Sequence, residues 1–285
     1  MKMPNSVCWN ITSRCNDHCL FCYRDRDSGE VDFERQKIIV EKIAGSGIRK
    51  VTFAGGEPLM AKKLRELILY AKQKGLIVSM TTNGILLTDE WLEFCMGNLD
   101  WITFSLDGAD EKIQSAMGRN PEHTKRTRML LEKIKRTEMK ICRVKLNTVV
   151  SRINQDYVTE LADWVLEYSV SRWKLFQFVP LRGSAREHWD SFFISDEDFN
   201  QTVDKVRQFM GEQRQRVTVS GRENIESAYF VIFPNGDIRI STGLKDQTIG
   251  NAVSDNLEEI WSKGSYMREL HEERTKFILE EGEQP

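Results

Sequence analysis

Short apolar strands alternate with amphipathic helices over the first 180 of 285 residues, and few folds accommodate such a pattern. We predict strands at residues 7–11, 50–54, 77–80, 101–106, 141–150 and 173–179, and helices at 33–43, 64–74, 89–96, 125–136 and 157–168. Strands separated by helices pair in parallel through right-handed crossovers. The sequence therefore predicts an α/β fold, a partial (β/α)6 TIM-like barrel, over residues 1–180.

The remaining residues, 181–285, lose this alternation. We predict an irregular stretch at 182–193, a charged helix at 196–213, a hairpin of strands 229–233 and 237–240, and a helix at 256–270. No linker rich in Gly, Ser or Pro separates this part from the barrel. We therefore expect a C-terminal α+β extension that closes the barrel and belongs to the same structural unit.

The charge balance and hydropathy exclude some classes of protein. Lys and Arg number 41 and Asp and Glu 43, which gives a net charge of −2 and argues against a nucleic-acid-binding protein. No apolar run approaches the roughly 20 residues of a membrane span, and the N-terminus has no apolar secretory core. We expect a cytoplasmic protein with neither nucleic acid nor membrane as partner.

Three of the six cysteines lie within eight residues, as Cys15-x-x-x-Cys19-x-x-Cys22. Three thiolates on one loop can bind three irons of a [4Fe–4S] cluster and leave the fourth iron open to a small molecule. The alternatives are structural zinc, with His18 or another residue as fourth ligand, and a loop of reactive thiols. A thiolate-ligated centre in a reducing compartment fits this spacing better than a disulfide framework.

Polar, glycine-containing turns follow the next three predicted strands: residues 55–58 (GGEP), 81–84 (TTNG) and 105–108 (SLDG). Ligand sites of parallel α/β folds gather at the carboxyl ends of the strands. Each turn alone is weak evidence, because Asn-Gly and Asp-Gly are ordinary turn formers. Together with the cysteine loop, they predict a ligand site at this end of the sheet.

On these motifs the chain resembles the radical SAM superfamily. The resemblance implies a [4Fe–4S] cluster whose open iron binds S-adenosyl-L-methionine (SAM), and reductive cleavage that forms a 5′-deoxyadenosyl radical. Carried over by position, the cluster ligands are Cys15, Cys19 and Cys22, and the SAM-binding residues are Phe21, Gly55, Gly56, Glu57, Asn83, Ser105, Asp107 and Arg119. It also implies a reductant such as flavodoxin or ferredoxin. The alternative for Arg119 is a solvated surface arginine.

The last two predicted barrel strands alternate in polarity. Their apolar faces should meet the outer helices, and the opposite faces then point four polar side chains into the barrel: Lys145, Asn147, Arg172 and Lys174. Buried cations need partners, so the residues favour an anionic ligand, with phosphate the obvious candidate. The alternative is that Arg172 and Lys174 lie on a solvated edge strand.

Within this superfamily, the chain resembles the viperin family at residues 145–154, 172–177 and 194–199. The resemblance implies that Lys145, Arg172 and Lys174 bind a nucleoside triphosphate, which is converted to a 3′-deoxy-3′,4′-didehydro nucleotide in antiviral defence. Tyr229 falls where that family has a tyrosine proposed to return a hydrogen atom; the alternative is a half-buried strand aromatic. We keep open an enzyme that modifies a peptide or another metabolite, and a zinc-stabilised binding protein.

Overall fold

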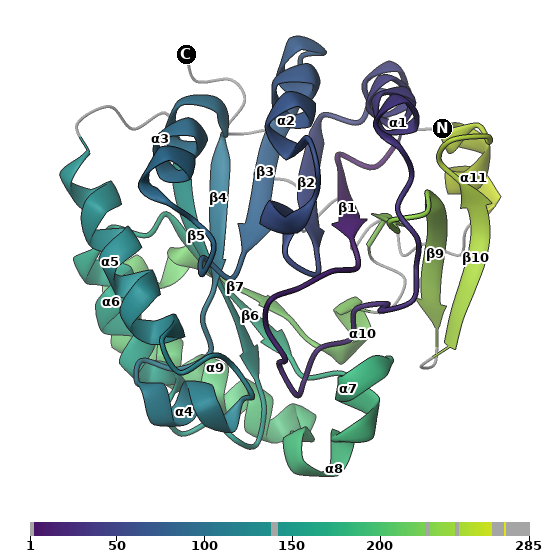
Figure 1. The fold of residues 1–285 in the computed structure, drawn as a ribbon. Helices are drawn as coiled ribbons and strands as arrows, with labels where there is room; N and C mark the ends of the chain where they lie inside the picture. The colour runs from purple at the N-terminus through teal and green to yellow at the C-terminus, as the bar shows by residue number, and fades with distance from the viewer. Residues whose placement is uncertain (1–2, 138–141, 226–228, 243–244, 264–270, 272–285) are drawn as a thin grey trace. The chain divides into compact units, whose positions relative to one another are not determined.

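The computed structural model describes residues 3–137, 142–225, 229–242, 245–263 and 271 (Figure 1). The chain forms two compact units. The first comprises residues 1–15, 25–80 and 224–285, and the second comprises residues 16–24 and 81–223. In the described part of the chain, no helix is both long and apolar enough to cross a bilayer.

The first unit is built on strands in the order β10-β9-β8-β1-β2-β3. Their bounds are β1 (Ser6–Thr12), β2 (Lys50–Gly55), β3 (Ile77–Thr82, whose last two residues belong to the second unit), β8 (Val231–Ile232), β9 (Asp237–Thr242) and β10 (Lys245–Asn251). Pairing is parallel from β8 through β1 and β2 to β3, and antiparallel from β8 to β10.

The helical elements of this unit are α1 (Phe33–Gly45), η1 (Pro58–Met60), α2 (Leu64–Gln73) and α11 (Leu257–Lys263), and the short α10 (Arg222–Ile225) crosses the unit boundary. Figure 1 shows α1 and α2 against the same side of β1, β2 and β3. Asp32 is the N-cap of helix α1, and its side chain accepts a hydrogen bond from the Arg35 backbone N–H. Helix α2 buries Leu64, Leu67 and Ile68, the i, i+3, i+4 stripe expected of a helix on a sheet.

The second unit holds four parallel strands in the order β4 (Trp101–Ser105), β5 (Arg143–Val150), β6 (Arg172–Gln177) and β7 (Val217–Ser220). Its helices are α3 (Asp89–Asn98), α4 (Glu111–Ala116), α5 (His123–Arg136), η2 (Val158–Glu160), α6 (Leu161–Glu167), α7 (Gly183–Glu187), α8 (Trp189–Phe192), α9 (Asp196–Met210) and η3 (Gly211–Arg216). Figure 1 shows α5, α6 and α9 on one side of these strands.

Alternation along β5 and β6 separates a core face from a polar face. Leu146, Trp173 and Leu175 are completely buried. The Trp173 indole N–H donates to Thr148 Oγ1 at 2.9 Å. This hydrogen bond between β6 and β5 satisfies both polar groups inside the core. The core face therefore fixes which side chains of β5 and β6 point the other way.

The six barrel strands predicted from the sequence are all present, as is the hairpin formed by β8 and β9. Two predictions were wrong: the stretch at 182–193 contains helices α7 and α8, and the helix predicted to reach residue 213 ends at Met210. The backbone of Gly211 takes φ 53°, which breaks the helix there. The predicted start of β5 at Ile141 and the end of the C-terminal helix past Lys263 lie outside the described residues.

Candidate active site

The cysteine loop follows β1 and has no regular secondary structure. Cys15 belongs to the first unit, and Cys19 and Cys22 belong to the second, where the Cys22 N–H donates to the Cys19 carbonyl at 3.2 Å. None of the six cysteines, all of which lie in the described residues, forms a disulfide, and burial raises the pKa of the Cys19 thiol above its usual range. No three His, Cys, Asp or Glu side chains among the described residues are grouped to hold a metal ion, so the cluster ligands stay a prediction.

Gly55 and Gly56, at the end of β2, pack against the backbone that leads into this loop. The Gly56 N–H donates to the Thr12 carbonyl, and the Glu57 N–H donates to the Arg14 carbonyl, both at 2.8 Å. A Cβ on Gly55 would collide with the Thr12 carbonyl oxygen, and a Cβ on Gly56 with that of Arg14. The close approach that the two glycines permit is therefore one between two segments of the chain itself.

Glu57 is completely buried, and its carboxylate accepts a hydrogen bond from the Leu59 N–H at the start of η1. The loop between β1 and α1 is held in the same region by a second carboxylate. Glu30 accepts hydrogen bonds from the Thr12 hydroxyl and from Arg14 Nε, the latter at 3.0 Å. These contacts position the residues that precede Cys15, and sequence reasoning missed Arg14 and Glu30 because no local spacing links them.

A buried charge cluster lies in the second unit. Arg119 Nε is 2.5 Å from Asp107 Oδ2, and Arg119 Nη1 is 3.6 Å from Asp17 Oδ2; none of these side chains is more than 6% exposed. The guanidinium also stacks on Phe21, with its Cζ 5.1 Å from the ring centroid. Burial raises the pKa of Asp107, while Arg119 acts against this rise. The structure thus excludes the solvated surface position for Arg119.

Both the carboxylate and the backbone N–H of Asp107 form hydrogen bonds with protein groups. Its Oδ1 accepts from the Val149 N–H at 2.8 Å, and its own N–H donates to Gln114 Oε1 at 3.2 Å. Because Gln114 uses its oxygen there, its Nε2 donates to His123 Nδ1 at 2.7 Å. His123 is therefore neutral, with its proton on Nε2. Asp17, Gln114 and His123 were not predicted as site residues, and no signal in the sequence distinguishes them.

Asn83 directly follows β3, and Ser105 is the last residue of β4. The Asn83 side-chain amide donates to Asn16 Oδ1 at 2.8 Å, and its oxygen accepts from the Ile85 N–H at 3.0 Å. Ser105 is half-buried at the end of β4. Asn83 thus connects the turn after β3 to Asn16 of the cysteine loop, within the second unit. The contacts of all these residues with SAM remain predictions.

Strand register brings the predicted substrate-binding residues together. Lys145 pairs with Arg172, and Asn147 pairs with Lys174, on the face of β5 and β6 opposite the apolar core. Arg172 Cζ lies 6.0 Å from the centroid of the Trp101 ring, and Lys174 Nζ lies 4.9 Å from that of Phe176. The strand positions on this face include no acidic residue. The face is suited to an anionic group.

Tyr229 lies in the first unit, just before β8, and is half-buried. The residue next to it, Phe230, accepts a hydrogen bond from the Cys8 N–H through its carbonyl at 2.9 Å. The three residues that precede Tyr229 in the sequence lie outside the described part of the chain. Its role as a hydrogen donor stays a prediction.

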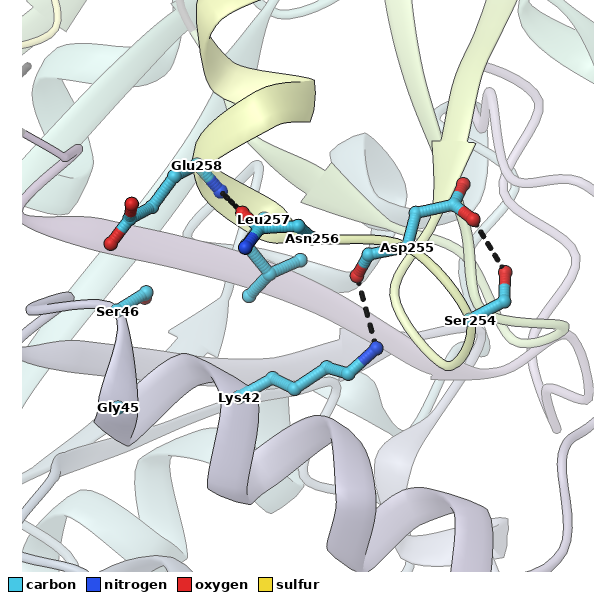
Figure 2. A pocket seen from close by; sticks show the side chains of 8 residues that line it. All are labelled: Lys42, Gly45, Ser46, Ser254, Asp255, Asn256, Leu257 and Glu258. Carbon is cyan, nitrogen blue, oxygen red and sulfur yellow. Dashed lines mark hydrogen bonds between the residues drawn. The ribbon is translucent and has the colours of Figure 1, made fainter.

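Two cavities of the first unit are lined by residues other than the predicted site residues, although Arg14, which precedes Cys15, lines one of them. Figure 2 shows one of about 330 Å³, in which Lys42 Nζ donates to the Asp255 carbonyl at 3.0 Å. The other, of about 620 Å³, is lined by Glu30, Phe33 and Lys62 among others. Neither cavity contains a residue that the sequence assigns to cofactor or substrate.

Comparison with known proteins identifies a family and several curated relatives. Residues 9–165 match the model of the Radical SAM superfamily. The S-adenosylmethionine-dependent nucleotide dehydratase of Lacinutrix mariniflava is 32% identical over 248 residues, which cover 82% of this chain and 50% of the relative. The protein of the same name from Flammeovirga pacifica is 32% identical over 209 residues, covering 70% and 71%. The chain thus spans about half the length of the first relative.

Among solved structures, Streptococcus suis SuiB bound to its precursor peptide SuiA is similar, with a TM-score of 0.75 at 18% identity. The match covers 90% of this chain and 64% of SuiB. The likeness shows the fold, a partial TIM barrel of alternating strands and helices with an antiparallel C-terminal extension. The fold class predicted from the sequence is confirmed.

Proposed function

Because this chain belongs to the radical SAM superfamily, we propose that it is an S-adenosylmethionine-dependent dehydratase of a nucleoside triphosphate, with a 3′-deoxy-3′,4′-didehydro nucleotide as product. The observation that most supports this substrate is the polar face of β5 and β6, where Lys145, Arg172 and Lys174 lie in adjacent register. The two curated relatives carry the name nucleotide dehydratase, which agrees with a phosphorylated ligand on that face.

The superfamily implies a [4Fe–4S] cluster and SAM, and the spacing of Cys15, Cys19 and Cys22 agrees with the cluster. Three thiols at this spacing are the soft donors that iron–sulfur clusters use, and metal binding would release the proton that burial keeps on the Cys19 thiol. When bound, the cluster and SAM supply a 5′-deoxyadenosyl radical that abstracts hydrogen from the substrate. We assign Cys15, Cys19 and Cys22 to the cluster.

We assign to SAM the residues named from the resemblance: Phe21, Gly55, Gly56, Glu57, Asn83, Ser105, Asp107 and Arg119. Their contacts divide this set by role. Asp107 has no exposed surface and holds the Arg119 guanidinium and the β5 backbone, so it orients Arg119. Arg119 in turn stacks on Phe21, and we assign its guanidinium to the SAM carboxylate.

On the substrate side, Lys145, Arg172 and Lys174 would bind phosphate oxygens by charge-assisted hydrogen bonds. Asn147 pairs with Ser105 on β4 and with Lys174 on β6, and it offers an amide to a sugar hydroxyl. Tyr229 is the proposed hydrogen donor of the late step. A reductant of the flavodoxin or ferredoxin class would deliver the electron.

Two alternatives have weaker support. The similarity to SuiB, a protein solved with a peptide, concerns the fold alone at 18% identity. No cysteine follows Cys142, so residues 143–285 offer no thiolate for an auxiliary cluster of the kind seen in peptide-modifying members. A zinc-stabilised binding protein does not agree with membership of the radical SAM superfamily.

The test is SAM cleavage by the anaerobically reconstituted enzyme. With SAM and dithionite present, 5′-deoxyadenosine is followed by chromatography while ATP, GTP, CTP and UTP are added in turn. We expect one triphosphate to raise 5′-deoxyadenosine well above background and to be converted itself. Cleavage that no nucleotide changes would reject the nucleotide substrate and leave the superfamily assignment intact.

Lys174→Ala gives the proposal a residue-level check. Loss of one charge-assisted phosphate contact should weaken triphosphate binding about ten- to hundredfold, corresponding to about 1.5–3 kcal/mol, and leave SAM affinity unchanged. The matched control is Lys205→Ala, which removes an exposed lysine from α9 of the same unit. Equal nucleotide affinities for the two variants would contradict the assignment of Lys174.

A further inference from the structure

We propose that the hydroxyl of Thr218, on β7, is a further substrate contact that binds the phosphate chain beside Lys174. The inference rests on the proposed function and extends it to a strand that the sequence does not predict. It also places a phosphate group at Lys174 and Thr218, and the sugar at Asn147 on the other side of Lys174.

The register of the second unit places Thr218 in line with the proposed substrate residues. Lys174 pairs with Asn147 on β5 and with Thr218 on β7, and Asn147 pairs with Ser105 on β4. Paired residues of neighbouring strands point to the same face, with their Cβ atoms about 5 Å apart. A single row of side chains, Ser105, Asn147, Lys174 and Thr218, therefore crosses four strands on the polar face.

The two neighbours of Lys174 in this row, Asn147 and Thr218, each have a polar side-chain atom without a hydrogen-bond partner among the described residues. Asn147 Oδ1 and Thr218 Oγ1 are buried, and neither has a hydrogen-bond partner among the described residues. Burying a polar atom without a partner costs free energy, and buried polar groups are for this reason almost always paired. Two such atoms on either side of one lysine indicate a ligand that supplies the missing partners.

The chemistry of the row specifies what each atom would bind. The Thr218 hydroxyl can donate, and beside the Lys174 ammonium its natural acceptor is an oxygen of the same anionic group. Asn147 Oδ1 can only accept, so on the other side of Lys174 the ligand must offer a donor, such as a sugar hydroxyl. A nucleoside triphosphate provides both kinds of group in one molecule.

Thr218→Val tests the contact, because valine keeps the shape and the β-branch of threonine and removes only the hydroxyl. Isothermal titration of the reconstituted enzyme would use the triphosphate that wild type binds best, the matching nucleoside, and SAM. We expect Thr218→Val to bind the triphosphate about tenfold more weakly, with unchanged affinity for the nucleoside and for SAM. Thr218→Ser, which keeps the hydroxyl, should restore most of the triphosphate affinity.

The outcomes separate this inference from the proposed function. If Lys174→Ala weakens triphosphate binding and Thr218→Val does not, the Thr218 contact is refuted and the proposed function stands. An equal loss of nucleoside affinity in Thr218→Val would also overturn the phosphate assignment. If wild type binds no triphosphate, both proposals fail. Thermal unfolding of each variant shows that the fold is retained.

Discussion

Gln114 bridges Asp107 and His123 through two buried hydrogen bonds. It accepts a hydrogen bond from the Asp107 backbone and donates one to His123, and Asp107 pairs with Arg119. Each of these groups is buried, so each relies on the next for its partner. The neutral imidazole of His123 therefore helps to hold the Asp107–Arg119 pair in place through Gln114.

His123 predicts a pH dependence of stability. Burial, aided by the charge of Arg119, lowers the pKa of His123 from its usual 6.5 to about 3. The unfolded chain binds a proton there below pH 6.5 and the folded chain does not, so this contribution is complete above pH 6.5 and is lost as the pH falls toward 3. Between pH 7.5 and 5.0 it should lower the free energy of unfolding by about 2 kcal/mol.

Urea unfolding at the two pH values measures this effect, and His123→Gln provides the comparison because its side chain does not titrate. The variant should be less stable than wild type at pH 7.5 and should lose about 2 kcal/mol less on going to pH 5.0. Parallel pH dependences of the two proteins would show that His123 does not stay neutral in the fold.

At the scale of elements, the end of β2 and the loop after β1 are fitted together without space for a side chain. Gly56→Ala would press a methyl group into the Arg14 carbonyl, and backbone cannot move aside as a flexible side chain can. We expect the variant to lose at least about 2 kcal/mol of unfolding free energy and to bind less iron, because Arg14 directly precedes Cys15. Urea unfolding and iron analysis measure the two effects.

Gly45→Ala is the control for this substitution. Gly45 ends α1, and a Cβ there meets no atom within 4 Å. The change should be neutral or stabilising by up to about 1 kcal/mol, with normal iron content. If the two alanine variants behaved alike, the packing explanation for Gly56 would be wrong.

Elements with a clear apolar period were predictable, and β7 and β10 were not. Strand β7 is only four residues long and follows the charged η3, so no alternation precedes it. Strand β10 is largely polar and its pairing with β9 shifts register between Thr248 and Gly250. Both form because a neighbouring strand offers backbone partners, a long-range effect that local sequence does not record.

For the molecule as a whole, the motifs predicted the family, and the alternation of strands and helices predicted the fold. The ion-pair partners of the charged residues were not predicted. The pairing of Arg119 with Asp17 and Asp107 depends on three segments that meet only after folding. The family resemblance named Arg119 and Asp107 as SAM-binding candidates, but it could not show that they bind each other. The sequence thus named the candidate residues without their contacts, and their roles toward SAM stay predictions.

The cluster assignment gives the prediction for the whole protein. Cys19→Ala removes one of three thiolate ligands, so reconstituted protein should hold far fewer than about four irons per chain and form no 5′-deoxyadenosine. Cys142→Ala removes a buried thiol at the edge of β5 and should keep both properties. Iron analysis, the visible absorption spectrum and the cleavage assay check this, and a brown, active Cys19→Ala enzyme would contradict the ligand set.

The rows of side chains on the polar face of β5, β6 and β7 also give the second unit a direction. Lys145 and Arg172 form one row, Asn147, Lys174 and Thr218 the next, and Val149, Phe176 and Ser220 the row nearest the carboxyl ends. Successive rows lie about 6.6 Å apart along the strands. Along these strands Lys145 and Arg172 lie nearer the amino ends, and Val149 and Phe176 lie nearer the carboxyl ends. A molecule with one anionic end would therefore bind this face with that end toward the amino ends of the strands.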